Sequence, residues 1–456
     1  MRTFYTGNGV MPTHWYNIAG EYPELYLPPI DPRTGDPLSS KDMLHLFPEI
    51  LALQDVNTHD VEIKIPVDIL EKYITWRPTP LIRAKNLEQS LGTKCKIFYK
   101  YEGVSPIGSH KVNTAIAQAF YCKKAGYKEL VTETGAGQVG SAFSMASAFY
   151  DLICHVFMVK TSYESKPGRR ILMQTFGSNV YSSPSNITEY GRSVLENNPD
   201  FTGSLGTAIA EAIEYATNNP NAAYVMGSAF NFVCLHNTII GNELKQQLKN
   251  CDIVPDYIIS CIGGGSGFAG ISFPFLREKL ENKKEINFIA VESNAAPKVS
   301  QGIFEYDYGD SAKFTPLIKM YTLGHTYVPK AMHAGGLRYH GLSPLVSNFI
   351  QKGYASIRAY EQLETFQAGQ LFAKLEGYLP APESCHSIKA AIDVALEHRN
   401  EEKNIVFCLT GHGFFDLAGY ESFNQGTMSS SAFGEDGIKE SLENLNNHLV
   451  NLNLKK

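Results

Sequence analysis

The sequence lacks the features that mark secreted, membrane-spanning and metal-binding chains. Its eight cysteines include no Cys-x-x-Cys pair. No stretch approaches the run of about 18 apolar residues that crosses a bilayer. Four histidines without paired ligand spacing argue against a metal cluster: His325, His333, His340 and His386. We therefore expect a cytoplasmic protein with reduced thiols, no membrane segment and no metal site.

The chain also lacks a strong excess of charge of either sign. The 40 basic residues nearly balance 46 acidic ones, which leaves a net charge of −6, and no basic block is longer than a pair such as Lys123-Lys124. Because nucleic-acid-binding proteins concentrate basic residues, we expect a small-molecule substrate instead. The 456 residues are 43% hydrophobic and contain no internal repeat. They suffice for two or three domains or one two-lobed unit.

Short β-rich runs alternate with amphipathic stretches along most of the chain. The predicted strands are Lys96 to Tyr101, Glu129 to Thr132, Ile153 to Val159, Tyr257 to Ile262, Ile286 to Val291 and Ile405 to Leu409. The predicted helices lie near 112–125, 138–150, 168–176, 206–218, 236–250, 270–282, 355–375 and 384–398. This order predicts an α/β fold with parallel sheets that bind ligands at the carboxyl ends of their strands. We expect loops over 302–344, and mobility there and in 425–437.

A lysine stands where a helix begins. Gly108-Ser109-His110-Lys111 follows the first predicted strand, and Ser109 is placed to cap the next helix, so Lys111 falls in its first turn. The helix dipole is positive there, which is unfavourable for a lysine unless its amine has a lowered pKa and forms a Schiff base. A lone lysine is more often a solvated surface charge. This stretch alone leaves both interpretations open.

A glycine-rich loop, Glu133 to Gly140, follows the second predicted strand. Its glycine spacing matches the dinucleotide-binding fingerprint. That fingerprint requires an acidic residue at the end of the next strand, where this chain has Lys160. We therefore favour a substrate carboxylate held by backbone N–H groups, with Glu133 as a general acid or base. A tight turn with a solvated Glu133 is the alternative.

Two further loops follow the predicted strands near residues 260 and 407. Gly263-Gly264-Gly265-Ser266-Gly267 favours an anion-binding nest, and no Gly-Lys-Ser/Thr follows it, so it is not a Walker A loop. A phosphate cradle beside a reactive lysine points to pyridoxal phosphate; a flexible loop without a ligand is the alternative. Thr410 ends the last strand. A neutral hydroxyl facing a pyridine nitrogen favours elimination and replacement at the β-carbon.

These motifs resemble, in the same order, those of tryptophan synthase beta chains, which are pyridoxal-phosphate-dependent enzymes of fold type II. The shared runs are Gly-Ser-His-Lys at 108–111, Glu-Thr-Gly-Ala-Gly-Gln at 133–138, Gly-Gly-Gly-Ser at 263–266, Pro-Ala-Pro-Glu-Ser at 380–384 and Thr-Gly-His-Gly at 410–413. Three more runs resemble the longer, second type of that chain: Trp15 to Asn17, Gly203 to Gly206 and His333 to Gly341. The resemblance therefore covers nearly the whole sequence.

The resemblance implies a role for each matching residue. Lys111 would hold pyridoxal phosphate as a Schiff base and move the α-proton, and Glu133 would assist loss of the β-substituent. The remaining cofactor contacts would come from His110, Gly263, Gly264, Gly265, Ser266, Glu383 and Thr410. The substrate carboxylate would be bound by Thr134, Gly135, Ala136, Gly137 and Gln138.

The resemblance also implies an activity and an architecture. The family is a lyase that condenses indole with L-serine through an aminoacrylate, giving L-tryptophan and water. The resemblance also implies a homodimer. It is compatible with a bound monovalent cation and with an alpha chain that delivers indole. We expect a two-lobed molecule with an arm (1–50), an N-terminal α/β domain (51–235, with a mobile subdomain near 126–220) and a C-terminal α/β domain (236–456). Elimination by a serine or threonine deaminase, a dinucleotide dehydrogenase and a noncatalytic binding subunit are the competing hypotheses.

Three positions depart from the family pattern. Gly267 replaces the usual Asn, and Thr410 replaces the more common Ser. Arg338 stands where the shorter beta chains place an Asp that contacts the serine hydroxyl. An arginine fork suits phosphate or carboxylate better than a neutral hydroxyl. We therefore hypothesise that Arg338 binds substrate and that O-phospho-L-serine is the preferred donor; the alternative is that Arg338 pairs with an internal carboxylate and serine remains the donor.

Overall fold

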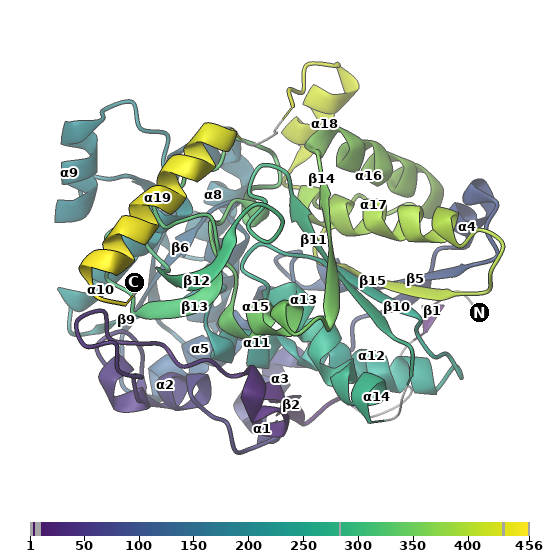
Figure 1. The fold of residues 1–456 in the computed structure, drawn as a ribbon, viewed down its shortest axis with the longest axis horizontal. Helices are drawn as coiled ribbons and strands as arrows, with labels where there is room; N and C mark the ends of the chain where they lie inside the picture. The colour runs from purple at the N-terminus through teal and green to yellow at the C-terminus, as the bar shows by residue number, and fades with distance from the viewer. Residues whose placement is uncertain (1–2, 5–10, 282–283, 431–433, 455–456) are drawn as a thin grey trace.

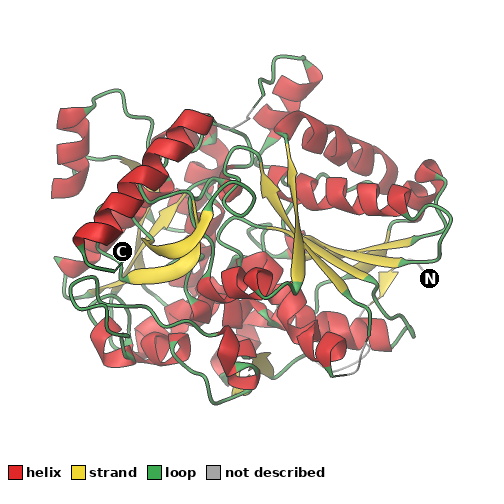
Figure 2. Ribbon diagram, in the orientation of Figure 1, coloured by secondary structure: helices red, strands yellow, loops and turns green. Residues whose placement is uncertain are grey.

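The computed structural model describes residues 3–4, 11–281, 284–430 and 434–454 and arranges them around two sheets (Figures 1 and 2). The larger sheet has seven strands, of which the five at its centre and far edge pair in parallel and β4 and β1 are antiparallel. Its order is β1 (Thr3–Phe4), β4 (Leu81–Arg83), β5 (Lys96–Tyr101), β15 (Asn404–Leu409), β10 (Tyr257–Cys261), β11 (Asn287–Ser293) and β14 (Ala355–Tyr360).

Helices cover both faces of the larger sheet, as Figure 1 shows. On one face lie α16 (Gln362–Glu376) and α17 (Pro382–Glu397); on the other lie α12 (Ile239–Lys249), α13 (Ser266–Ser272) and α15 (Pro344–Gln351). Because neither face meets water, the central strands are mostly apolar, and Ile405 to Leu409 are fully buried.

The smaller sheet is parallel in all four strands. Its order is β8 (Asn179–Ser183), β7 (Ile153–Val159), β6 (Glu129–Thr134) and β9 (Ala222–Tyr224). One face packs against α10 (Leu205–Thr217), the other against α6 (Gln138–Phe149) and α8 (Pro167–Thr175). Two helices connect the sheets: α5 (Val112–Lys124), which packs on α6, and α11 (Asn231–Asn237), which packs on α5 and α13.

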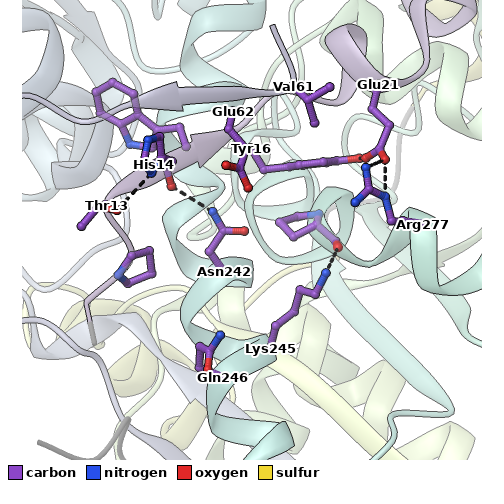
Figure 3. Close-up of a pocket in the computed structure, with 13 residues that line it drawn as sticks. Thr13, His14, Tyr16, Glu21, Val61, Glu62, Asn242, Lys245, Gln246 and Arg277 are labelled. Atoms are coloured by element: carbon purple, nitrogen blue, oxygen red, sulfur yellow. Dashed lines mark hydrogen bonds and ion pairs between the residues drawn. The ribbon is translucent and has the colours of Figure 1, made fainter. Parts of the chain in front are cut away.

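The segment before β4 packs along the body. Its elements are β2 (His14–Tyr16), α1 (Ile18–Glu21), η1 (Pro23–Leu25), η2 (Ser40–Met43), α2 (Glu49–Asp55), β3 (Glu62–Lys64) and α3 (Val67–Tyr73). Trp15 is fully buried. Figure 3 shows the hollow between β2 and α12: the His14 carbonyl accepts from Asn242 at 3.0 Å, and Glu21 pairs with Arg277 of α14 (Leu276–Leu280). This ion pair neutralises both charges within the hollow.

A hairpin and a C-terminal helix complete the fold. The antiparallel pair β12 (Ile303–Tyr308) and β13 (Leu317–Thr322) is crossed by α19 (Glu435–Asn451), seen in yellow in Figure 1, through Leu445 and Leu449. The shorter elements are α4 (Lys85–Leu91), η3 (Glu102–Val104), α7 (Lys160–Ser165), α9 (Glu189–Asn197), η4 (Phe273–Phe275), η5 (Gly335–Leu337) and α18 (Leu417–Asn424). No helix of the described ranges is long and apolar enough to cross a membrane.

All six predicted strands are present within two residues of the expected bounds, whereas three helix predictions are partly wrong. The helix expected over 355–375 begins only at Gln362, because 355–360 form the edge strand β14. The helix expected over 270–282 is broken at Pro274, which cannot donate a helical hydrogen bond. The helix expected over 236–250 is divided at Thr238. The expected loops over 302–344 contain the β12–β13 hairpin, and part of 425–437 lies outside the described residues.

A buried ionic network fastens β5 to α12. Arg77 contacts Glu102 at 2.7 Å and Glu243 at 2.8 Å, and Lys100 contacts Glu243 at 2.8 Å. All four side chains are fully buried. Two cations and two anions thus neutralise each other where water cannot.

We predict that Glu243→Gln lowers the free energy of unfolding by about 3 kcal/mol or more, because it leaves two buried cations with one carboxylate. Chemical denaturation measures this. The matched control is Glu397→Gln, which breaks an ion pair with Arg358 in which the glutamate side chain is 52% exposed. That change should cost less than about 1 kcal/mol. Equal losses in the two variants would contradict the assignment.

Candidate active site

The loops that follow β5, β6, β10 and β15 meet and enclose two adjoining hollows. The glycine-loop hollow is lined by His110, Lys111, Gln138, Cys261, Gly263 to Gly267, Gly336, Leu337, Glu383 and Thr410. The Glu133 hollow is lined by Lys111, Glu133, Thr134, Gly135, Ala136, Gln138, Val139, Leu205, Ser228, Gly264, Gly335, Gly336 and Tyr339. Every predicted site residue except Gly137 and Arg338 lines one of them, and Lys111 lines both.

Lys111 is held by uncharged acceptors. Its Nζ donates to the Gly227 carbonyl at 2.6 Å and to Ser266 Oγ at 2.8 Å. Burial lowers the pKa of this amine to about 8. The sequence predicts Ser109 as the cap of α5, but the capping position is Lys111 itself, without a side-chain cap. The reason is that Ser109 bridges to Gly411 and the N–H of His110 donates to the Thr410 carbonyl at 3.0 Å, so the helix begins later.

The glycine loop after β10 is closed in on both sides by backbone and small side chains. A Cβ added to Gly263 would lie 2.1 Å from the Gly336 carbonyl oxygen, and one added to Gly264 would lie 2.4 Å from Ser228 Cβ. Gly265 has φ +97°, which side chains rarely adopt, and begins α13. Only glycines therefore fit this loop, and their exposed backbone amides suit a phosphate.

His110 lies beside the glycine loop. Its Nε2 is 3.3 Å from Ser266 Oγ, and burial lowers its pKa to about 3, so the ring is neutral. A Cβ added to Gly267 would lie 3.3 Å from His110 Nε2. A side chain at position 267 would therefore require His110 to shift slightly.

Glu133 is a buried carboxyl group on β6, 3% exposed, whose Oε2 accepts from the Tyr224 hydroxyl at 2.9 Å. Burial raises the pKa of Glu133 to about 7, although the Tyr224 hydrogen bond opposes the shift. A carboxyl group with this pKa can both give and accept a proton near neutrality. Tyr224 is not among the residues predicted from the sequence. Its signal is the run 222–226 followed by Gly227-Ser228, which repeats the strand-then-small-residue pattern of the other loops.

Glu383 joins the loops of the two sheets. One carboxylate oxygen accepts from the Gly336 N–H at 2.8 Å and the other from Gln138 Nε2 at 3.1 Å, and burial raises the pKa of the group. Thr410 Oγ1 lies 2.8 Å from Ser384 Oγ in the same hollow. Cys261 also lines this hollow.

Gly137 and Arg338 lie outside both hollows. Gly137, with φ +95°, precedes α6. Arg338 donates to the Pro329 carbonyl at 2.8 Å and to Thr161 Oγ1 at 3.3 Å, and it lines a third hollow with Lys166. No carboxylate pairs with it among the described residues, so the expected alternative of an internal ion pair is absent there. Arg338 directly follows the turn η5, whose Gly335 and Gly336 line the Glu133 hollow.

Comparison with known proteins shows which family the sequence matches. The family model described as pyridoxal-phosphate dependent enzyme matches residues 74–411. The chain is 52% identical over 434 residues to "Tryptophan synthase beta chain 2" of Aquifex aeolicus (strain VF5), which covers 94% of this chain and 100% of the relative. It is 50% identical over 423 residues to the protein of the same name from Aeropyrum pernix, covering 92% and 94%.

Solved structures agree on the fold. The chain is similar to a fungal L-serine ammonia-lyase from Rhizomucor miehei, with a TM-score of 0.56 and 20% identity over 77% of this chain and 98% of that one. It is also similar to a threonine deaminase from T.th., with a TM-score of 0.52 and 17% identity over 76% and 97%. These likenesses confirm the predicted α/β fold type II architecture.

We predict that apoenzyme binds added pyridoxal phosphate faster as the pH rises, and that the rate levels off above about 8. The neutral amine is the nucleophile, and burial lowers its pKa to that value. An ordinary lysine would continue to gain reactivity toward pH ~10.4. Stopped-flow absorbance of the Schiff base measures the rate. Lys111→Arg is the control and should give no Schiff-base band; a wild-type rate still rising at high pH would contradict the assignment.

Proposed function

Because this chain belongs to the pyridoxal-phosphate dependent enzymes and, within them, to the tryptophan synthase beta chains, we propose that it is a lyase that joins indole to L-serine or O-phospho-L-serine, giving L-tryptophan. The observation that carries this proposal is that Lys111 and Glu133 line one hollow, each with a pKa moved toward neutrality by burial. A base and an acid can thus act on the same bound substrate.

Pyridoxal phosphate fits the site, and when bound it supplies the electron sink that makes the α-carbon acidic. Lys111 would hold it through the amine, and the glycine loop 263–266 would hold its phosphate beside neutral His110. Glu383 and the Thr410 hydroxyl would flank the ring. No other charged side chain lines the glycine-loop hollow in the described ranges, so the backbone amides of the loop provide the anion site.

The side chains then divide the proton transfers. Lys111 takes the α-proton of the amino acid, and Glu133 gives a proton to the departing β-hydroxyl, which leaves as water. A bond then forms between the β-carbon and a ring carbon of indole, and the proton displaced from that carbon returns to Glu133. Lys111 finally gives a proton back to the α-carbon, which completes L-tryptophan. The backbone of 134–138 binds the substrate carboxylate at the start of α6.

A deaminase is the second candidate, because both similar solved structures are named for that type of reaction. At 20% and 17% identity, these structures show a shared fold and do not show a shared reaction. The much higher identity to tryptophan synthase beta chains, 52% and 50% over nearly the whole chain, favours replacement over elimination.

The test is the product formed from indole and either donor without a partner protein. We predict tryptophan in excess of pyruvate. Glu133→Gln should lower tryptophan formation by about 100-fold or more while the cofactor absorbance remains. Glu129→Gln, at the other end of β6, is the control and should retain activity. Pyruvate without tryptophan would overturn the proposal in favour of the deaminase.

Arg338 supports a preference for O-phospho-L-serine. The guanidinium is buried, its Nε has no hydrogen-bond partner among the described residues, and it lies beside the turn whose Gly335 and Gly336 line the Glu133 hollow. We propose that it receives the departing phosphate.

We predict that Arg338→Gln lowers kcat/KM for O-phospho-L-serine about tenfold or more and changes that for L-serine less, because a charge-assisted hydrogen bond is lost only with the phosphorylated donor. Steady-state kinetics with both donors measure this. Arg358→Gln, which removes an arginine paired with Glu397 at the surface, is the matched control. A higher wild-type kcat/KM for serine would overturn the donor preference but not tryptophan synthesis.

Other expectations rest on the family and stay predictions. They are a homodimer, an alpha-chain partner, a monovalent cation, and the division into 1–50, 51–235 and 236–456 with closure of 126–220 over the site. A cytoplasmic location is supported by eight free cysteines, which fit a reducing compartment.

A further inference from the structure

The carbonyl that accepts from Lys111 belongs to a strained segment. Gly227 lies in Met226 to Asn231, which joins β9 to α11, and Ala229 in this segment has φ +76°. A residue with a side chain keeps such a backbone conformation only where the surrounding structure imposes it. Something outside the hollow must therefore hold this segment in place.

Gln118 holds the first residue of the segment. Its Nε2 donates to the Met226 carbonyl at 2.8 Å, and the Met226 N–H donates to its Oε1 at 3.1 Å. The side chain is fully buried. Gln118 lies on α5, the helix that begins at Lys111. One helix therefore carries both the amine and the side chain that holds Met226, the residue before the acceptor Gly227.

Asp55 holds the last residue of the segment. The Asn231 N–H donates to Asp55 Oδ1 at 2.6 Å, and Asn231 Nδ2 donates to the Asp55 carbonyl at 2.9 Å. Asp55 is the final residue of α2 and is 3% exposed.

A chain of hydrogen bonds runs from Gln118 to α2, the helix that carries Asp55. Gln118 Nε2 donates to Thr114 Oγ1 at 2.7 Å, Thr114 Oγ1 lies 3.1 Å from His236 Nδ1, and His236 Nε2 lies 2.9 Å from Gln54 Oε1. Burial lowers the pKa of His236 to about 3, so the ring is neutral. Gln54 Nε2 donates to the Tyr121 hydroxyl, so its Oε1 accepts from His236 and the donors of the chain point one way. Gln54 precedes Asp55 on α2, which therefore contacts both ends.

We infer that Gln118 is a positioning residue for the Lys111 amine: it fixes the Gly227 carbonyl, and α2 holds it through Gln54 and Asp55. The inference rests on the proposed function for the step it affects, which is proton movement by Lys111. Substrate binding uses the loop 134–138 and is expected to change little.

The test is Gln118→Met, which keeps the volume and removes the hydrogen bonds to Met226. The Gly227 carbonyl stabilises the protonated amine, so its displacement should lower the pH at which the Schiff-base rate levels off by about one unit. We expect kcat for tryptophan to fall about tenfold and KM for the donor to stay within about twofold. We call the pH at which the Schiff-base rate levels off the plateau pH. An unchanged plateau pH in the folded variant would overturn the inference.

Gln247→Met is the matched control. Gln247 is a fully buried glutamine that donates to the Thr79 carbonyl at 2.8 Å and accepts from Lys100 at 2.9 Å, away from both hollows. It should lower the melting temperature without moving the plateau pH; a plateau that moves equally in both variants would reduce Gln118 to a general structural role.

A second variant covers the case in which Gln118→Met does not fold. Gln54→Met breaks the chain at its far end and should move the plateau pH in the same direction by less; no movement in a folded Gln54→Met would overturn the role of α2. The plateau is measured with pyridoxal phosphate alone. It therefore separates failure of this inference from failure of the proposed function, which would show only in the products.

Discussion

The Lys111 amine is buried between a backbone carbonyl and a hydroxyl, and among the described residues it forms no ion pair. Burial without a counter-charge favours the neutral amine, which is the nucleophilic form. The two groups that accept from the amine are both uncharged, the Gly227 carbonyl and the Ser266 hydroxyl. The carboxyl groups of Glu133 and Glu383 line the two hollows but do not pair with the amine.

Two other buried lysines show which part of this arrangement matters. Lys100 is fully buried, and burial lowers the pKa of its amine too, but Glu243 lies 2.8 Å away and fixes its charge in a structural network. Lys298 is fully buried, and burial lowers its pKa to about 8, yet it lines neither hollow. Burial therefore accounts for the pKa of Lys111, whereas access to a hollow shared with Glu133 distinguishes it from the other two lysines.

The sequence predicts the strand-end loops well, because each is a local pattern: an apolar strand, a glycine turn and a helix start. Lys111, Glu133, the glycine loop and Thr410 are found in this way and lie together. Contacts that join segments far apart in the chain leave no such pattern. Tyr224 on Glu133 and Gln118 on Met226 depend on how β9 and α5 pack, which no periodicity encodes. The role expected for Arg338 rests on its charge alone, and its hydrogen bond to the Pro329 carbonyl is visible only in the tertiary structure.

Those distant contacts hold the strained backbone at Ala229 in place. Ala229 has φ +76°, a conformation that costs energy for a residue with a side chain, and it lies two residues after the carbonyl that accepts from Lys111. Holding the strained form requires groups on both sides, and the fold draws them from α5 and α2. Because α5 also begins at Lys111, any shift of that helix moves the amine and its acceptor together. One helix thus carries the amine and also the side chain that holds the residue before its acceptor.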